Sequence, residues 1–137
     1  MRGYLVGSID LSMRVVGTDG TPRITVVDYK TNWLGGPGDP LTAWAYRPAA
    51  LVDAMEHAHY PLQALIYSVA LHRYLRGRVV GYDAARHLGG VLYLFIRGMT
   101  GPDVPRVSGH PCGVFSWQPP HALIVELSDL FDEGVTP

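Results

Sequence analysis

Two runs of apolar and β-branched residues, 4–16 and 22–30, are separated by a short loop at residues 17–21, and this loop constrains the fold more than any other feature. The loop is rich in glycine and threonine, so the two runs are predicted to form an antiparallel hairpin. With five residues in the loop, the register places Asp10 directly opposite Asp28. A loop of even length would turn these two carboxylates to opposite faces of the sheet, because a shift of one residue flips every side chain.

The end of the second run combines charged groups that favour chemistry. Asp28 and Lys30 lie two residues apart, so they share one face of a strand, and the same register sets Ser8 opposite Lys30. Two carboxylates facing each other repel, and a hard cation such as Mg²⁺, which binds carboxylate and phosphate oxygens, would offset that repulsion. The predicted site is therefore a magnesium site formed by Asp10 and Asp28, with the Lys30 ammonium beside a scissile phosphate.

Lys30 is the single lysine in a chain that has ten arginines. A position that keeps lysine in such a composition suggests that a compact ammonium is needed there and that a planar guanidinium does not serve. A surface ion pair at a strand end is the simpler explanation of Asp28 and Lys30 alone. The hairpin register and the isolated lysine favour catalysis.

The composition is that of one globular domain spanning residues 1–137. The chain is 47% hydrophobic and 17% charged, and its formal net charge is -1, so no global positive field indicates nucleic acid. Its one cysteine, Cys112, excludes an internal disulfide and any four-cysteine metal site in this sequence. No apolar run approaches the roughly 20 residues of a membrane span, and we expect a cytoplasmic protein.

The remaining elements predict an α/β (α+β) fold with a mixed sheet, in the order ββααββα. The apolar run at 89–96 has the pattern of a strand at the centre of the sheet. In chain order, we expect a loop at 35–40, helices at 47–58 and 60–75, this strand, a loop at 100–111, a strand at 113–117 and a helix at 119–131.

The helix at 60–75 has two stripes of residues at helical spacing, one aliphatic and one amphipathic. One is aliphatic and is predicted to face the core; it contains Leu62, Leu65, Ile66 and Val69. The other bears hydroxyl and amide groups and contains Tyr60, Gln63, Tyr67, Ala70 and Tyr74. Helical spacing leaves two possibilities for this second stripe, because tyrosines also pack at the edge of a core with their hydroxyls in water.

Four blocks of sequence resemble the carboxy-terminal nuclease domains of the RecB type, which belong to the PD-(D/E)xK nuclease superfamily. These blocks are G-S-I-D at 7–10, V-D-Y-K-T-N-W-L-G at 27–35, Y-P-L-Q-A-L-I-Y at 60–67, and Y-D at 82–83 followed by the run at 87–99. They occur in the order typical of that group, and the resemblance extends from Gly3 to about Trp117.

This resemblance implies a restriction-endonuclease-like core, with a mixed central sheet flanked by helices. It implies that Asp10, Asp28 and the carbonyl of Tyr29 bind Mg²⁺ and that Lys30 is the catalytic lysine. The glutamine and tyrosines at Gln63, Tyr67 and Tyr60 then shape the site and the path of the DNA strand.

The function implied is a metal-dependent, exodeoxyribonuclease V-like hydrolysis of DNA in end processing and recombinational repair, with DNA and the helicase and other subunits of a RecBCD-like complex as partners. Such domains have a helix before the first strand that brings a histidine and a further acid to the metals. This sequence does not contain that helix, so we expect a fragment of a longer helicase-nuclease subunit. A non-catalytic docking module of the same complex and a stand-alone nuclease are the alternatives. None of the six histidines is assigned to the site.

Overall fold

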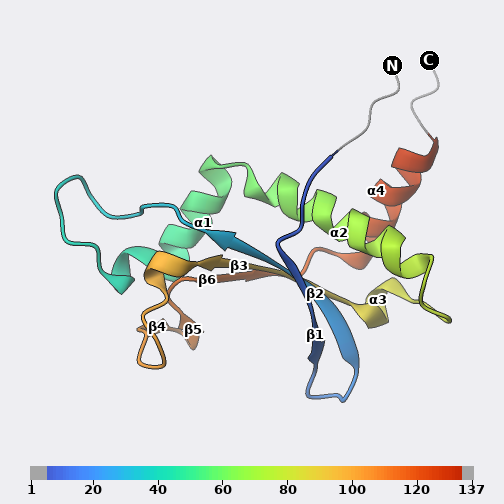
Figure 1. Cartoon of the computed structure of the whole chain (residues 1–137), viewed down its shortest axis with the longest axis horizontal. Helices are drawn as coiled ribbons and strands as arrows, with labels where there is room; N and C mark the ends of the chain where they lie inside the picture. Colours follow the sequence, from blue (N-terminus) through green and yellow to red (C-terminus); the bar gives the residue numbers. More distant parts are fainter. Residues whose placement is uncertain (1–5, 134–137) are drawn as a thin grey trace.

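The computed structural model describes residues 6–133 and contains a four-stranded sheet, a small two-stranded sheet, four α-helices and two short 3-10 helices in that range (Figure 1). In chain order the elements are β1 (Leu11–Val16), β2 (Pro22–Lys30), η1 (Ala43–Tyr46), α1 (Pro48–His57), α2 (Tyr60–Arg76), α3 (Ala84–His87), β3 (Leu88–Phe95), η2 (Ile96–Gly98), β4 (Arg106–Val107), β5 (His110–Pro111), β6 (Val114–Trp117) and α4 (His121–Glu133). The predicted order of the main elements is confirmed.

The β1–β2 hairpin has the predicted register. Val16 pairs with Pro22 at the loop, and the ladder runs back to Leu11 paired with Val27. Within the loop, Asp19 accepts a hydrogen bond from the Thr21 amide at 3.0 Å. An odd loop length therefore sets which side chains share a face of this sheet, as the sequence indicated.

The first strand is shorter than expected. A strand over residues 4–16 was predicted, but β1 begins at Leu11, and residues 4 and 5 lie outside the described residues. The predicted pairing of Ser8 with Lys30 is absent for the same reason. The Asp10 carboxylate accepts the Tyr29 amide at 3.0 Å, so a side chain replaces the backbone acceptor that a longer ladder would supply.

The four-stranded sheet is mixed and has the order β1-β2-β3-β6. β3 runs parallel to β2, whereas β1 and β6 are antiparallel to their neighbours. Val91, Tyr93 and Phe95 alternate along β3 and are buried on one face. The prediction that this run lies in the middle of the sheet is confirmed.

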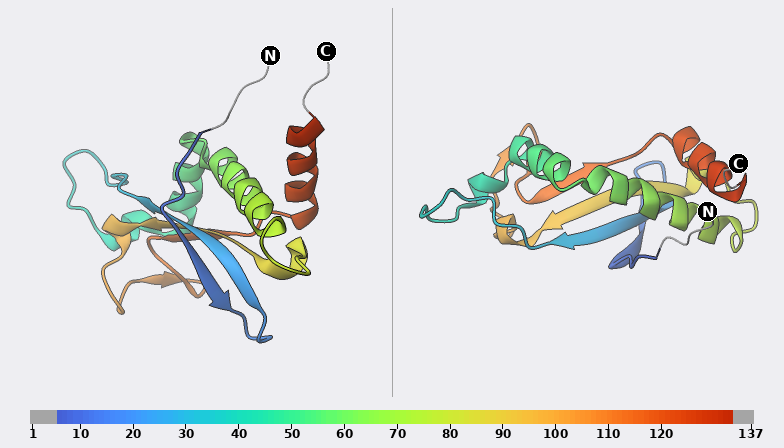
Figure 2. Two further views of the ribbon diagram at one scale, coloured as in Figure 1. Left: turned by 45° about the vertical axis from the view of Figure 1, so that its right-hand side comes forward. Right: turned by 90° about the horizontal axis from the view of Figure 1, so that it is seen from above.

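Helices α1, α2 and α4 lie on one face of the sheet, where the core is formed (Figure 2). The resemblance implied helices flanking the sheet, and among residues 6–133 only this face is covered by the long helices. On the opposite face Leu11, Met13, Val15 and Tyr29 are 37–48% exposed. No helix in the described part of the chain is both long and apolar enough to cross a lipid bilayer.

The aliphatic stripe predicted for α2 is wrong in part. Val69 is buried, but Leu62 is 61% exposed, and the buried face instead includes Ala64, Ser68 and His72. Of the predicted stripe, Leu65 is only partly buried against the core. Small or polar side chains therefore make up part of the face that α2 buries.

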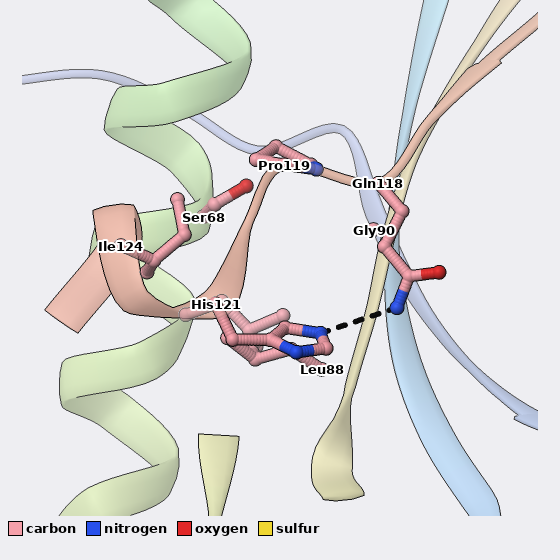
Figure 3. Close-up of a pocket in the computed structure, with 8 residues that line it drawn as sticks. Ser68, Leu88, Gly90, Gln118, Pro119, His121 and Ile124 are labelled. Carbon is pink, nitrogen blue, oxygen red and sulfur yellow. Dashed lines mark hydrogen bonds between the residues drawn. The ribbon is translucent and has the colours of Figure 1, made fainter. Parts of the chain in front are cut away.

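The start of α4 lies against α2 and β3, around a small cavity (Figure 3). Gly90 in β3 has φ +86°, and a Cβ there would lie 2.6 Å from the carbonyl oxygen of Trp117. His121 is hydrogen bonded to the Gln118 amide at 3.1 Å. The predicted loop at 100–111 is also corrected, because it contains the β4–β5 pair.

Candidate functional site

The site is built around Asp28 and Lys30, at the carboxyl end of β2. The Lys30 ammonium lies 2.7 Å from Asp28 Oδ2, and the two side chains are only 11% and 5% exposed. Asp28 Oδ2 is buried, and this ion pair is its only polar contact among the described residues. A surface ion pair, the simpler reading of the sequence, does not fit this burial. Keeping both charges out of water requires further polar partners.

Gln63 of α2 supplies one of those partners. Its side-chain oxygen accepts from the Lys30 ammonium at 3.1 Å, and its amide group donates to the Tyr67 hydroxyl at 3.0 Å. The prediction that Gln63 points toward Lys30 is therefore confirmed in geometry, and Tyr67 reaches Lys30 only through Gln63. Helical spacing allows this, since residues four apart lie on one face.

Aromatic rings enclose the ammonium of Lys30. Its Nζ lies 3.8 Å from the ring centroid of Tyr60 and 5.1 Å from that of Tyr93, and these two rings are stacked. The faces of aromatic rings attract cations, so the rings hold the charge without adding a competing carboxylate. Tyr60 thus contacts the predicted site directly.

Tyr93 was not predicted as a site residue. Its hydroxyl lies 3.1 Å from the Gln63 side-chain oxygen and 3.3 Å from the Tyr60 carbonyl oxygen, and it can donate to either. Burial raises the pKa of Tyr93, and the nearby Asp28 carboxylate raises it further, so the hydroxyl stays protonated. The only indication of this role in the sequence was the Tyr93 hydroxyl, which is the one polar side-chain group in the run at 89–96.

Asn32 also contacts the site and was not predicted as a site residue. Its carbonyl oxygen accepts from the buried Tyr46 hydroxyl at 2.8 Å, and its amide group lies 3.4 Å from the Tyr60 hydroxyl. These contacts fix the chain where it leaves β2. Asn32 stands in the block at 27–35 that carries the family resemblance, which was the available signal.

Asp10 approaches this end of β2 from the segment before β1. Its exposed carboxylate is anchored by the Tyr29 amide, on the residue that follows Asp28. One carboxylate oxygen is used in this bond, and the other remains open to a further ligand. The ladder ends at Leu11, so the predicted pairing of Asp10 with Asp28 is absent, and the Asp10 carboxylate instead contacts the amide of the next residue, Tyr29.

The donor set suits a hard cation only in part. Among residues 6–133 no three histidine, cysteine or acidic side chains form a cluster that could hold a metal ion. Mg²⁺ is commonly held by one or two carboxylates, with water and phosphate oxygens completing the coordination. The buried Asp28 Oδ2, whose one polar neighbour among the described residues is Lys30, and the exposed Asp10 carboxylate fit a site with two carboxylate ligands.

The fold and the site define an α+β domain with a mixed four-stranded sheet, in which a buried Asp–Lys pair stands at the carboxyl end of a central strand. Proteins called RecBCD enzyme subunit RecB contain a segment similar to this sequence. The identity is 57% over 132 residues for Mycolicibacterium smegmatis (96% of this chain, 12% of the relative), 57% over 134 residues for Mycobacterium tuberculosis H37Rv (98% and 11%), and 39% over 132 residues for Escherichia coli K12 (96% and 10%).

The chain therefore spans about a tenth of the length of the curated relatives it matches. The similarity covers all of the residues of the site, from Asp10 to Tyr93, because it extends over nearly the whole chain. No protein family model matches the sequence.

Proposed function

We propose that this chain is a metal-dependent DNA nuclease domain that hydrolyses phosphodiester bonds, as part of a RecB-like helicase-nuclease subunit. The observation that carries this proposal is the buried Asp28–Lys30 pair held by Gln63. A buried charge pair is a weak source of stability, which favours a role for this one in a site. A PD-(D/E)xK nuclease core is the fold that this arrangement best supports.

In this proposal Asp10, Asp28 and the carbonyl of Tyr29 hold Mg²⁺. A bound magnesium ion lowers the pKa of its water and neutralises charge on the phosphate. Asp28 is suited to binding because its buried Oδ2 has only the Lys30 ammonium, at 2.7 Å, as a polar neighbour among the described residues. Asp10 is suited because the Tyr29 amide fixes its carboxylate while leaving an oxygen open.

Lys30 orients the nucleophile and stabilises the negative charge that develops on the phosphate. Its ammonium is held in place by the Gln63 oxygen and the Tyr60 ring, so little reorganisation is needed when the charge forms. Tyr67 and Tyr93 act through Gln63, since both of their hydroxyls contact its side-chain amide. They are positioning residues in this scheme.

The names of the relatives suggest partners. They are subunits of an enzyme called RecBCD, so the partners proposed for this chain are DNA and the other subunits of a similar helicase-nuclease complex. Such a complex would process DNA ends in recombinational repair.

A non-catalytic docking module is a second candidate. The observation that favours it is the lack of any cluster of three metal-binding side chains among residues 6–133. It predicts a folded domain whose Asp28–Lys30 pair can be neutralised without loss of DNA cleavage by the complex.

Two measurements distinguish these candidates. The first is the binding of Mg²⁺ or Mn²⁺ by the 137-residue chain, measured by isothermal titration calorimetry. The second is the cleavage of fluorescently labelled DNA by the full polypeptide that carries this sequence, with Mg²⁺ or with a chelator. Asp28→Asn should weaken cation binding by more than about 10-fold and abolish cleavage, because it removes a ligand charge. Lys30→Met should retain cation binding and lose cleavage.

Asp53→Asn is the matched control, because Asp53 is an exposed carboxylate on α1 and is not assigned to the site. It should bind cations and cleave DNA like the wild type, and circular dichroism should show that all variants are folded. Cleavage that persists in Asp28→Asn or in chelator would contradict the nuclease proposal, as would cation binding that does not depend on Asp28.

A further inference from the structure

An aromatic–arginine pair lies just beyond the end of the strand that carries Lys30. Lys30 of β2 pairs with Phe95 of β3 in a parallel ladder, so the carboxyl ends of both strands lie at the same end of the sheet. Trp33 follows Lys30 by three residues, and Arg97 of η2 follows Phe95 by two. The two side chains meet there, with the guanidinium carbon of Arg97 5.9 Å from the centroid of the Trp33 ring.

The Arg97 side chain is fixed in orientation but keeps its charge available. Its Nε donates to the Thr31 carbonyl oxygen at 2.8 Å, which ties the guanidinium to the segment that leaves β2. Arg97 is exposed and forms no ion pair with a carboxylate of residues 6–133. Its terminal N–H groups are therefore free to bind an anion.

The Trp33 ring is 55% exposed. A Cβ at Gly35 would lie 3.0 Å from Trp33 Nε1, so one edge of the indole lies close to this part of the loop. An exposed indole beside a guanidinium without an ion pair offers both a stacking surface and a positive charge. Single-stranded nucleic acids are bound by this combination, in which bases stack on aromatic rings and phosphates contact basic groups.

A second pair of the same kind stands on the neighbouring element. The guanidinium of Arg47 lies 5.8 Å from the ring centroid of Trp44, which is also 55% exposed. Trp44 belongs to η1, which packs on η2 through Tyr46 and Gly98. The two exposed tryptophans of the described residues thus both lie on the segment that connects β2 to α1.

We propose that the Trp33–Arg97 pair binds a DNA single strand, with a base stacked on the indole and a neighbouring phosphate on the guanidinium. The strand then passes the Asp28–Lys30 pair, because β2 places Lys30 three residues before Trp33. The choice of DNA rests on the proposed function. A duplex hides the faces of its bases, so the site selects single strands and frayed ends.

The test is fluorescence anisotropy with a labelled oligothymidylate of about 12 nucleotides, within the range of site sizes of single-strand-binding proteins. The wild-type 137-residue chain is compared with Trp33→Ala, Trp33→Phe and Arg97→Ala in a chelator, so that binding is measured without cleavage. Trp33→Ala should weaken binding about 5- to 150-fold, the usual effect of losing one stacked base. Trp33→Phe should keep most of the affinity, since phenylalanine also stacks.

Arg97→Ala should weaken binding and reduce the slope of log affinity against log salt by about 0.7, as expected for the loss of one phosphate contact. Tyr74→Ala is the matched control. Tyr74 is equally exposed at 55% and lies 4.2 Å from the Arg78 guanidinium, but it stands near the carboxyl end of α2, whereas Gln63 is near the other end. Tyr74→Ala should bind within twofold of the wild type.

The proposal is overturned if the wild type does not bind the oligonucleotide, if Trp33→Ala binds like the wild type, or if Tyr74→Ala loses as much affinity. An equal loss for a blunt duplex would contradict the selection of single strands. These outcomes are separate from the nuclease test, because Asp28→Asn can abolish cleavage whether or not binding depends on Trp33.

Discussion

At the scale of single residues, the side chain of Gln63 links the polar groups of the site. Its oxygen lies within 3.1 Å of both the Lys30 ammonium and the Tyr93 hydroxyl, and its amide donates to Tyr67. Leaving any of these groups without a partner in the core would cost about 1–3 kcal/mol. The network therefore holds Lys30 in one position.

His72 is a second buried polar residue, and it predicts a dependence of stability on pH. The ring is 4% exposed, its Nδ1 lies 2.9 Å from the Tyr82 hydroxyl, and Nε2 has no partner among the described residues. Burial lowers the pKa of His72 below its ordinary value of 6.5; the nearby Arg76 and Arg73 lower it further and Asp129 opposes them. Below pH 6.5 the unfolded chain therefore binds a proton at this ring more readily than the folded protein does.

Stability should therefore fall as the pH drops through 6.5, because the unfolded state binds more protons there. The test measures the free energy of unfolding in urea between about pH 7.5 and 5.5, where histidine titrates. His72→Gln should flatten this dependence, since glutamine can bond Tyr82 without titrating. His110→Gln, at an exposed position in β5, should behave like the wild type; an unchanged pH dependence in His72→Gln would contradict this account.

At the scale of secondary-structure elements, two glycines with similar backbone angles have different surroundings. Gly20 in the hairpin loop has φ +73° and open space around it. Gly90 in β3 has φ +86°, and a Cβ there would also meet the carbonyl oxygen of Trp117 at 2.6 Å. The close approach between β3 and the chain that follows β6 needs glycine at position 90.

Gly20→Ala should lower the free energy of unfolding by about 1–2 kcal/mol, the cost of a left-handed conformation for a residue with a Cβ. Gly90→Ala should cost about 1–3 kcal/mol more, because backbone atoms must also shift to make room. Urea unfolding monitored by circular dichroism measures both. Equal losses in the two variants would show that the contact with Trp117 does not constrain β3.

At the scale of the whole molecule, the attachment of α4 to α2 combines an exposed ion pair with hydrogen bonds to a buried residue. Arg73 of α2 forms an ion pair with Asp132, and it donates to the hydroxyl and carbonyl oxygens of Ser128 at 3.2 and 3.3 Å. Ser128 is fully buried, whereas the Asp132 side chain is 52% exposed. Arg76 adds a second contact to Asp132 at 3.2 Å.

These two kinds of contact should respond differently to salt. Asp132→Asn should lower the free energy of unfolding by less than about 1 kcal/mol at low salt, and the effect should vanish near 1 M salt, because exposed pairs are screened. Arg73→Met should cost about 1–3 kcal/mol at both salt concentrations, since it leaves the buried Ser128 groups unpaired. Arg86→Met, on an exposed arginine of α3 without an ion pair among residues 6–133, is the control. If the loss of unfolding free energy in Arg73→Met disappeared at high salt, the hydrogen bonds to Ser128 would not contribute separately from the exposed ion pair.

The sequence determined those features that depend on local geometry. The odd length of the loop at 17–21 set the register of β1 and β2, and the alternation of side chains put Asp28 and Lys30 on one face. Helical spacing put Gln63 and Tyr67 on one face of α2. These relations follow from strand and helix periods, which hold wherever the element lies in the fold.

The tertiary structure decided which of two possible faces is buried and where β1 begins. Leu62 is exposed because α2 packs through the face that bears Ala64 and Ser68. The β1–β2 ladder stops before Asp10, where the Tyr29 amide, nineteen residues away in the chain, donates to the Asp10 carboxylate and not to a backbone carbonyl. Tyr93 joins the site for a similar reason, since its hydroxyl meets Gln63 only when β3 and α2 are packed together. Contacts between distant segments leave no periodic pattern in the sequence, so packing alone selects them.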